Sequence, residues 1–336
     1  MVSTSSTNDD GRPTGAGGTT GDRVLVLAGG LSHERDVSIR SGRRVAEALR
    51  DAGFEVEERD IDATLLPRLQ QDSPACVVPL LHGESGEDGA IREVLELVGV
   101  PYVGSRPSAC RVAFDKPVAK PVVTAAGLAT PRGVTLPHEA FRELGAAAVM
   151  AGLIQSLGLP LMVKPAQGGS ALGCTPVREP GELPSAMVNA FAYGDTALVE
   201  RLVTGTEVAV PVVDLGDGPQ ALPVVEIHPD GGVYDYTARY TAGATEFQVP
   251  AQLPAEVLAE CARVAVTAHE ALGLRDLSRS DLIVDPDGTV WFLEVNVAPG
   301  LTETSTVPLS VQADGLDLGE LVGRMVAAAV RRGGIA

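Results

Sequence analysis

The strongest limit on the fold is an alternation of apolar strands and amphipathic helices near the start of the chain. "RVLVLAGG" (23–30) is an apolar run that ends in glycines, and a helical pattern through Val37, Val45 and Leu49 follows it. After Gly53 comes a second extended run, "FEVEERDI", and "ACVVPLLHG", "GAIREVLELVG" and "VPYVG" repeat the alternation. Strand–helix–strand units favour a parallel sheet, so we expect residues 23–105 to form an α/β domain.

The rest of the chain follows a different pattern. Residues 106–195 contain two helical stretches, the strand "PLMVKPA" and the glycine-rich turn "QGGSALG". Residues 196–336 run strand after strand, then give a helix at 254–272, a hairpin and a final helix at 318–331. This mixture predicts an antiparallel α+β architecture, which we divide into a central and a C-terminal subdomain. The first 22 residues are polar and rich in Gly, Ser and Thr, so we expect a disordered tail.

Charge and composition exclude several classes of partner. The 336 residues are 45% hydrophobic, enough for a sizeable core, and carry a formal net charge of −18. Nucleic acids and anionic membrane surfaces need a Lys/Arg-rich face, so neither is an expected partner. The uncharged run at 145–163 contains Gln155, Ser156 and Pro160, which predict a helix, a turn and a strand instead of a membrane span. The four cysteines match no metal or redox spacing, which favours reduced thiols in a cytoplasmic protein.

The hairpin at 279–296, "RSDLIVDPDGTVWFLEVN", carries an unusual set of polar residues. If Pro286 and Asp287 form the tip of its turn, residue 281 faces 292 and residue 279 faces 294. Side chains alternate across a strand, so one face is expected to carry Arg279, Asp281, Glu294 and Asn296, with Ile283 and Phe292 among them. The opposite, core-facing set is expected to be Leu282, Val284, Trp291, Leu293 and Val295.

Two interpretations of the polar face remain open. An antiparallel hairpin commonly turns one face to water, and these residues would then simply be solvated. The sharper hypothesis is an Mg²⁺–nucleotide site, because two carboxylates and a carboxamide supply the oxygen donors that Mg²⁺ prefers, and Arg279 adds a planar fork of donors.

A phosphate-binding element would have to come from elsewhere in the chain. The sequence has no GxxxxGK[ST] loop, but "VKPAQGGSALG" offers Lys164 followed by Gly168, Gly169 and Gly173. Glycine amides can approach a triphosphate closely. A glycine-rich surface turn beside a lysine is the alternative.

Seven segments, in this order along the chain, resemble motifs of the D-alanine–D-alanine ligase family. They are "AGGLSHERDVSIRSG" (28–42), "LLHGESGEDG" (80–89), "AFDK" (113–116), "VKPAQGGSALG", "LVERLVTGTEVAV" (198–210), "YDYTARYTAGATE" (234–246) and "RSDLIV…LEVNVAPGLTETS" (279–305). The resemblance implies an ATP-grasp fold behind an N-terminal parallel α/β domain that holds the first D-amino acid. It also implies an ATP-dependent ligase that joins two D-alanines through a D-alanyl phosphate, in the synthesis of peptidoglycan precursors.

For the nucleotide, the resemblance implies that Mg²⁺ ions, or Mn²⁺ in their place, bridge ATP phosphates to Asp281, Glu294 and Asn296. Lysines and the glycine-rich loop contact the phosphates, one glutamate accepts from the adenine amino group beside the backbone of Leu202, and another holds the ribose. Without the resemblance these two glutamates, Glu200 and Glu207, are equally well explained as solvated charges. The implied nucleotide-binding residues are Lys116, Lys164, Gly169, Ser170, Glu200, Leu202, Glu207 and Arg239.

For the amino acids, the resemblance implies that Glu34 holds the first ammonium, with Ser170 and Tyr240 as its partners in a hydrogen-bonded triad. Arg279 and the backbone of Gly300 stabilise the tetrahedral oxyanion. "TARYTAGATE" is the expected lid. The implied substrate-site residues are Glu34, His82, Ser170, Tyr240, Arg279, Gly300 and Ser305, of which His82 is otherwise more simply a structural histidine.

The chain departs from the family pattern at three residues and in one segment, "NVAPGLTETST", which carries polar groups where the family is usually more apolar. Arg239 stands where the family often has Lys, Ala171 where a second Ser commonly follows, and Thr306 where Leu is usual. The last change lies next to the second-substrate pocket. We therefore keep three hypotheses: a D-Ala–D-Ala ligase, which Tyr240 favours; a ligase that uses another D-amino or hydroxy acid; and a nucleotide-binding pseudoenzyme. Family relatives are usually dimers, so a homodimer is expected.

Overall fold

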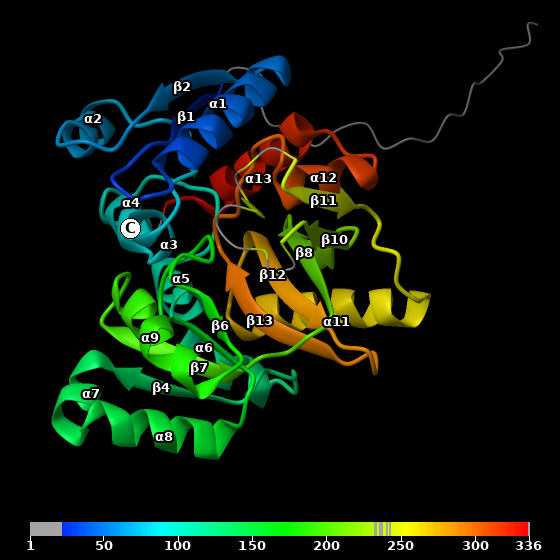
Figure 1. Cartoon of the computed structure of the whole chain (residues 1–336). Helices are drawn as coiled ribbons and strands as arrows, with labels where there is room; N and C mark the ends of the chain where they lie inside the picture. Colours follow the sequence, from blue (N-terminus) through cyan, green and yellow to red (C-terminus); the bar gives the residue numbers. More distant parts are fainter. Residues whose placement is uncertain (1–21, 232–233, 235–237, 240, 242, 335–336) are drawn as a thin grey trace, which may run out of the picture.

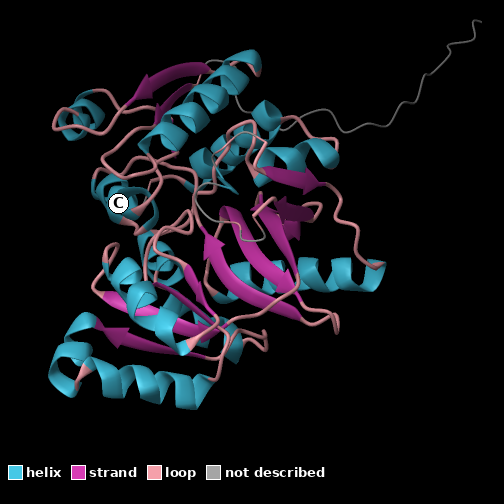
Figure 2. Ribbon diagram, viewed as in Figure 1, coloured by secondary structure: helices cyan, strands magenta, loops and turns pink. Residues whose placement is uncertain are grey.

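The computed structural model describes residues 22–231, 234, 238–239, 241 and 243–334. Except for Asp22, the expected tail at 1–22 lies outside the described residues, and so does Tyr240. The described chain contains three sheets with helices packed around them (Figures 1 and 2). In the view of Figure 1 the first sheet lies at the top, the second, in green, at the lower left, and the third at the right.

The first sheet confirms the predicted parallel arrangement. Its central strand β1 (Arg23–Leu27) lies between β2 (Glu55–Arg59) and β3 (Cys76–Pro79), and both pairings are parallel. Helix α1 (Arg35–Asp51) connects β1 to β2 and buries the apolar positions of the predicted helical pattern, including Val45 and Leu49. The other helices of this region are α2 (Leu65–Gln71), α3 (Glu84–Glu87) and α4 (Ala90–Leu97).

The second sheet is antiparallel throughout, in the order β4-β7-β5-β6. Its strands are β4 (Gly133–Pro137), β5 (Leu161–Pro165), β6 (Thr175–Val177) and β7 (Thr196–Arg201). Helices α7 (His138–Leu144), α8 (Ala146–Leu157) and α9 (Leu183–Phe191) surround it, with the 3₁₀ turn η1 (Pro180–Glu182) before α9. The uncharged run at 145–163 therefore forms a helix, a turn and a strand, as predicted.

The strand pairing of the second sheet indicates where the boundary between the central and C-terminal subdomains lies. A boundary between residues 195 and 196 falls directly before β7, although β7 pairs with β5 from Ala197 to Arg201. We propose a boundary after Arg201, because it keeps this sheet in one unit.

The third sheet has the order β11-β10-β8-β12-β13, with β9 paired to β8, and all pairings are antiparallel. Its strands are β8 (Thr206–Asp214), β9 (Pro219–Ala221), β10 (Val225–Pro229), β11 (Thr245–Gln248), β12 (Asp276–Val284) and β13 (Val290–Asn296). Helices α5 (Pro107–Phe114), α6 (Lys116–Ala125) and α11 (Ala255–Ala271) share its core. The predicted division assigns α5 and α6 to the central subdomain, but their apolar side chains pack against this third sheet.

The last two helices, α12 (Thr306–Ala313) and α13 (Leu318–Arg332), return to the first sheet. Met325 and Val326 of α13 belong to the same core as Val24 and Leu49. The helices α1 and α13 approach closely because α13 has glycine at the contact: a Cβ on Gly319 would lie 2.4 Å from the Ala48 carbonyl oxygen.

Asp276, the first residue of β12, ties the first sheet to the third. Its buried carboxylate accepts a hydrogen bond from the Gly104 amide at 2.7 Å and pairs with both Nη atoms of Arg332 at 2.6 and 2.7 Å. Asp276 has a φ of 63°, a left-handed conformation that Asp tolerates better than most side chains. We call this contact the Asp276 junction.

No helix in the described ranges has both the length and the apolarity needed to cross a bilayer. The four cysteines carry free thiols, and Cys76, Cys110 and Cys261 are buried.

Candidate functional site

The hairpin of β12 and β13 has a different register from the predicted one. Asp281 pairs with Glu294 and Arg279 with Asn296, whereas we expected 281 to face 292 and 279 to face 294. The turn is longer because Asp285 organises it: its Oδ1 accepts from the amides of Asp287 and Thr289, and its Oδ2 from the indole of Trp291. The predicted register was therefore wrong by two residues at the polar end of the hairpin.

A β-bulge next to Asp281 explains why the polar cluster survives this error. Between Asp281 and Leu282 the register shifts by one residue, and Leu293 is the extra residue on β13. A shift of two residues keeps the polar side chains on one face, whereas a shift of one reverses the faces beyond the bulge. Phe292 is therefore fully buried in the core, while Leu293 lines a cavity, and both predictions for these residues were wrong.

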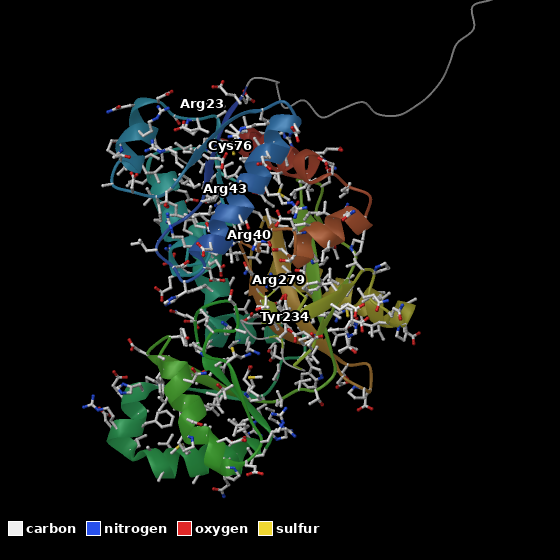
Figure 3. The ribbon with its side chains drawn as sticks, turned by 45° about the horizontal axis from the view of Figure 1, so that its top comes forward. Arg23, Arg40, Arg43, Cys76, Tyr234 and Arg279 are labelled. Atoms are coloured by element: carbon white, nitrogen blue, oxygen red, sulfur yellow. The ribbon has the colours of Figure 1, made fainter. Side chains whose placement is uncertain are left out.

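Asp281 is held by the guanidinium two residues before it. Arg279 donates from Nε and Nη2 to the two carboxylate oxygens, at 2.6 and 2.8 Å. Arg239 lies 3.9 Å from the same carboxylate and stacks over the ring of Tyr234 at 4.2 Å. Figure 3 shows Arg279 and Tyr234 next to each other in the middle of the molecule. Burial opposes the charge on Arg279, but Asp281 outweighs it and raises the pKa of Arg279.

Lys116, the first residue of α6, bridges the hairpin and the glycine-rich loop. Its Nζ donates to the Gly168 carbonyl at 2.7 Å and lies 3.3 Å from Oε2 of Glu294. Helix α6 begins here because the Asp115 side chain caps it by accepting from the Val118 amide. Burial opposes the charge on Glu294, but Lys116 and Lys164 outweigh it and lower its pKa to about 2.

The glycine-rich loop between β5 and β6 rests against Glu34, the residue before α1. Ser170 Oγ donates to Oε1 of Glu34, and a Cβ on Gly169 would lie 3.4 Å from Oε2. Ser170 and Ala171 have φ values of 53° and 54°. This left-handed conformation costs an L-residue about 1–2 kcal/mol, so contacts of the loop must offset that strain.

Glu200, on β7, is clamped by two lysines. Lys164 on the adjacent strand β5 lies 2.6 Å from its Oε2, and Lys120 on α6 lies 2.5 Å from its Oε1. Glu200 is 1% exposed, and burial opposes its charge, but the two lysines outweigh burial and lower its pKa. The chain contains three lysines, Lys116, Lys120 and Lys164, and all three are buried around this site.

Glu207 and Leu202 lie near this clamp. Glu207 pairs with Ile283 across β8 and β12, and burial raises the pKa of Glu207 to about 7. The Leu202 amide donates to the Pro160 carbonyl at 3.0 Å. A ligand at Leu202 would therefore meet the backbone carbonyl and not the amide.

His82 and Glu87 occupy the opposite end of the site. The Nδ1–H of His82 donates to the Ala298 carbonyl at 2.8 Å, because a carbonyl can only accept. Burial lowers the pKa of His82 and raises that of Glu87 to about 8. Both side chains are therefore mainly uncharged near pH 7.

Gly300 and Ser305 lie beside this end. A Cβ on Gly300 would lie 2.9 Å from Ser305 Oγ, so a larger residue at position 300 would displace this hydroxyl. Ser305 Oγ accepts from the Thr302 amide at 3.1 Å and lies 2.8 Å from its hydroxyl. This corner is lined by hydroxyl groups.

These side chains surround two adjoining cavities. The first cavity includes Glu34, His82, Glu87, Ser170, Arg279, Asn296, Gly300 and Ser305 in its lining. The second cavity includes Lys164, Glu200, Leu202, Glu207, Ile283 and Leu293. The residues that line both are Lys116, Gly168, Gly169, Tyr234, Arg239, Asp281 and Glu294. The cationic and acidic residues of the hairpin, α6 and the glycine-rich loop thus stand at the boundary between two compartments.

Within the described ranges, each site residue predicted from the sequence lines one of these cavities, and Tyr240 lies outside those ranges. The prediction missed Glu87, Lys120 and Tyr234. Lys120 follows Lys116 by one helical turn in "DKPVAK", and Glu87 lies inside the quoted "LLHGESGEDG", so both carried a signal of spacing or position.

The hairpin residues suit a divalent cation chemically. Asp281 and Glu294 are direct cross-strand partners, and Asn296 keeps a carboxamide oxygen that accepts from the Ala298 amide at 2.7 Å. No group of three or more His, Cys, Asp and Glu side chains is assembled as a metal site in the part of the chain that the structure describes. An ion here would need further oxygen ligands, such as phosphate, and Arg279 and Lys116 would have to share their carboxylates.

Comparisons with known proteins agree with this arrangement. Residues 122–327 match the family model described as "D-ala D-ala ligase C-terminus", and residues 67–105 match "D-ala D-ala ligase N-terminus". The chain is 38% identical to a D-alanine–D-alanine ligase of Moorella thermoacetica over 305 residues, which cover 90% of this chain and 98% of the relative. It is 40% identical to one of Anaeromyxobacter dehalogenans over 307 residues, which cover 91% and 96%.

Solved structures with the same fold include the VanG D-Ala:D-Ser ligase of Enterococcus faecalis. The TM-score is 0.77 and the identity 29%, over 92% of this chain and 99% of that one. The Bacillus anthracis D-alanine–D-alanine ligase complexed with ATP gives a TM-score of 0.74 and 26% identity, over 93% and 98%. Two matched family models, relatives aligned over nearly their whole length and a shared fold lead to one conclusion: the chain belongs to the D-alanine–D-alanine ligase family of ATP-dependent, ATP-grasp ligases.

Proposed function

We propose that the protein joins two D-alanines into D-alanyl-D-alanine at the expense of ATP. The observation that carries this proposal is the boundary between the two cavities, where Lys116, Asp281 and Glu294 face both sides. A group that passes from a nucleotide in the second cavity to an amino acid in the first must cross at these residues.

In the first step, the γ-phosphoryl group of ATP passes to a carboxylate oxygen of the first D-alanine, and ADP leaves. Such transfer is mainly a matter of position and charge neutralisation. Lys116, Lys164 and Arg239 would bind the phosphates, and the Gly168–Gly169 segment would cover them. Glu34 would hold the ammonium group of the first D-alanine, because the hydrogen bond from Ser170 already orients the Glu34 carboxylate.

In the second step, the amine of the second D-alanine, having lost a proton, attacks the acyl carbon, and the bond from that carbon to the phosphate oxygen breaks. Arg279 would donate to the oxyanion that forms, where one placed donor is worth about 3 kcal/mol. The Gly300 backbone would be the second donor, and Ser305 would bind the carboxylate of the second D-alanine.

Asp281, Glu294 and Asn296 would hold Mg²⁺, with Mn²⁺ as a substitute, and the bound ion would neutralise charge on the transferring phosphoryl group. Glu200, the Leu202 carbonyl and Glu207 would bind the adenosine. The remaining elements of the proposal are a role in peptidoglycan precursor synthesis, a cytoplasmic location and a homodimer.

A second candidate is a ligase that takes D-serine or a D-hydroxy acid as the second substrate. The hydroxyl groups of Thr302, Thr304, Ser305 and Thr306 line the first cavity near Gly300, and they would suit a polar substrate. The proteins of similar fold include a D-Ala:D-Ser ligase.

Phosphate release with ATP and Mg²⁺ tests the proposals. We expect release with D-alanine alone and a dipeptide product of two D-alanines. Faster release when D-serine or D-lactate is added, with the mixed product found by mass spectrometry, would support the second candidate instead. No release with any pair would refute both.

A further inference from the structure

Lys120 is a buried cation for which the proposed reaction has no use. It lies on α6 one turn after Lys116, so the two side chains share a face of the helix. Lys116 reaches Glu294 and the Gly168 carbonyl, whereas Lys120 reaches Glu200 at 2.5 Å. Helix α6 therefore supplies one ammonium group to Glu294 and one to Glu200, two carboxylates that line the second cavity.

The use of lysine instead of arginine at Lys120 and its two neighbours in the site is informative. The chain has 26 Lys and Arg residues, of which only Lys116, Lys120 and Lys164 are Lys, and each is at most 7% exposed. Arginine serves at every other cationic position. An ammonium group is a compact charge with freely rotating donors, and a guanidinium is a rigid planar fork. At each of these three sites the buried cation is therefore a compact ammonium group that can reorient.

The contacts of Glu200 create a physical problem. Lys164 lines the second cavity and is the proposed phosphate ligand, yet in this structure it is paired with Glu200 at 2.6 Å. If Lys164 turned to a phosphate and nothing else paired with Glu200, the cavity wall would hold a buried, uncompensated carboxylate, which is strongly unfavourable. Lys120 lies on the far side of Glu200, in a separate outer groove that Glu200 also lines.

We propose that Lys120 is a positioning residue: it is the permanent counter-ion of Glu200, and it allows Lys164 to exchange between Glu200 and the phosphates of the bound nucleotide. With Lys120 in place, Glu200 stays ionised and oriented toward adenine while Lys164 moves. The inference rests on the proposed function in one respect, because it takes the second cavity to be the nucleotide site.

The electrostatics of the clamp combine an attraction and a repulsion: in spite of burial, Glu200 raises the pKa of Lys164, and the second ammonium group opposes the first. Burial, followed by repulsion from Lys164, lowers the pKa of Lys120 to about 8. Two ammonium groups on one carboxylate therefore oppose each other. Departure of Lys164 toward a phosphate relieves that repulsion and leaves a one-to-one pair. Lys120 Nζ lies 2.5 Å from Oε1 of Glu200, so this contact is itself close enough to compensate the carboxylate.

A double-mutant cycle tests the proposal. The dissociation constant of a non-hydrolysable ATP analogue, with Mg²⁺, is measured by calorimetry for the native protein, Lys120→Met, Glu200→Gln and the double variant. We expect Lys120→Met to weaken binding by about 10- to 100-fold, the loss of one charge-assisted contact, because Lys164 then stays on Glu200. In the Glu200→Gln background the same change should have little effect, since a neutral carboxamide at this position needs no counter-ion.

Two further measurements separate this role from a structural one. The KM for D-alanine should not change in Lys120→Met. Arg111→Met removes an exposed cation from its own pair with Glu93, 2.8 Å away, and should leave nucleotide binding unchanged. Equal loss of binding in both backgrounds at position 200, or no loss in either, would overturn the proposal.

Misfolding of Lys120→Met would not end the test. The double variant removes the charges of Lys120 and Glu200 together and leaves the net charge of the clamp unchanged, with Lys164 as its remaining cation, so it should then fold and bind the analogue as Glu200→Gln does. Failure of the double variant to fold would show that Lys120 is needed for some other reason, and would also overturn the proposal. A native protein that binds the analogue but releases no phosphate would refute the ligase function and leave the cycle interpretable.

Discussion

The two cavities deal with charge in opposite ways. In the second, lysines already neutralise two of the carboxylates: Lys116 pairs with Glu294, and Lys120 and Lys164 with Glu200. In the first, burial favours the uncharged forms of His82 and Glu87, and hydroxyl groups line the corner near Ser305. A polyanionic ligand can take over existing cations, whereas a zwitterionic amino acid brings charges of both signs. The second cavity therefore suits a polyanionic ligand, and the first suits a zwitterionic one.

The largest expected effect comes from the boundary itself. Glu294→Gln removes the carboxylate that faces Asp281 while keeping the shape of the side chain. We expect kcat to fall about 10²- to 10³-fold, the size of a lost electrostatic contact to the transition state. Phosphate release measures this, and the thermal midpoint should stay within a few degrees. The exposed Glu256→Gln is the matched control, and full activity of Glu294→Gln would disprove the assignment of the boundary.

The next effect tests whether both cavities depend on the contact between the first and third sheets at the Asp276 junction. Asp276→Asn keeps a side chain that tolerates a positive φ but weakens the pair between this buried carboxylate and the partly exposed Arg332. We expect the free energy of unfolding to fall by about 1–3 kcal/mol, because a buried polar group is left poorly satisfied. Urea unfolding measures it. If the Asp276 junction aligns the first sheet with the third, the KM for D-alanine should also rise more than the KM for ATP.

A smaller effect separates the two cavities directly. Glu34→Gln removes a negative charge from the first cavity and leaves the contacts of the second unchanged. We expect the KM for D-alanine to rise about 10- to 100-fold, because hydrogen bonds to charged groups are worth about 1.5–3 kcal/mol. The dissociation constant of the ATP analogue should change much less, because Glu34 touches the second cavity only through the glycine-rich loop. An equal loss of affinity for D-alanine and for the ATP analogue would mean that the two cavities are not independent.

The smallest effect is a pH dependence that belongs to the first cavity. Burial, then the Glu34 charge, raises the pKa of Glu87, while the Gly83 amide and Arg279 oppose the rise and Glu294 adds to it. Because the folded-state pKa is raised to about 8, the stabilising contribution is complete below the unfolded pKa and is lost as the pH rises through 8. Between pH 7 and 8 the native protein should lose about 1 kcal/mol. Urea unfolding should show a smaller loss in Glu87→Gln, and Glu84→Gln, at an exposed neighbour, should match the native protein.

Much of the fold followed from local patterns. The parallel first sheet came from alternating apolar runs and helical periodicity, and α11 and α13 formed within one residue of the expected limits. The residues grouped by motif lie together around the two cavities. These features depend on short-range spacing, which the sequence displays directly.

The hairpin register did not follow, because it depends on two features with weak sequence signals. Asp285 forms hydrogen bonds that lengthen the turn, and Leu293 is an extra residue in a bulge. Lys120 and Glu87 were missed for a different reason. The partner of Lys120 is Glu200, which lies far away in the sequence. The pKa of Glu87 is raised mainly by burial, which arises only when the sheets and helices pack together.

The scarcity of lysine has a practical consequence for chemical labelling. Reagents that acylate side-chain amines have three targets in this protein, and all three lie around the second cavity. Conventional biotinylation or amine immobilisation would therefore find no exposed lysine among the described residues and would act on the site or on the α-amino group. The rate of such acylation would report whether a nucleotide occupies the protein.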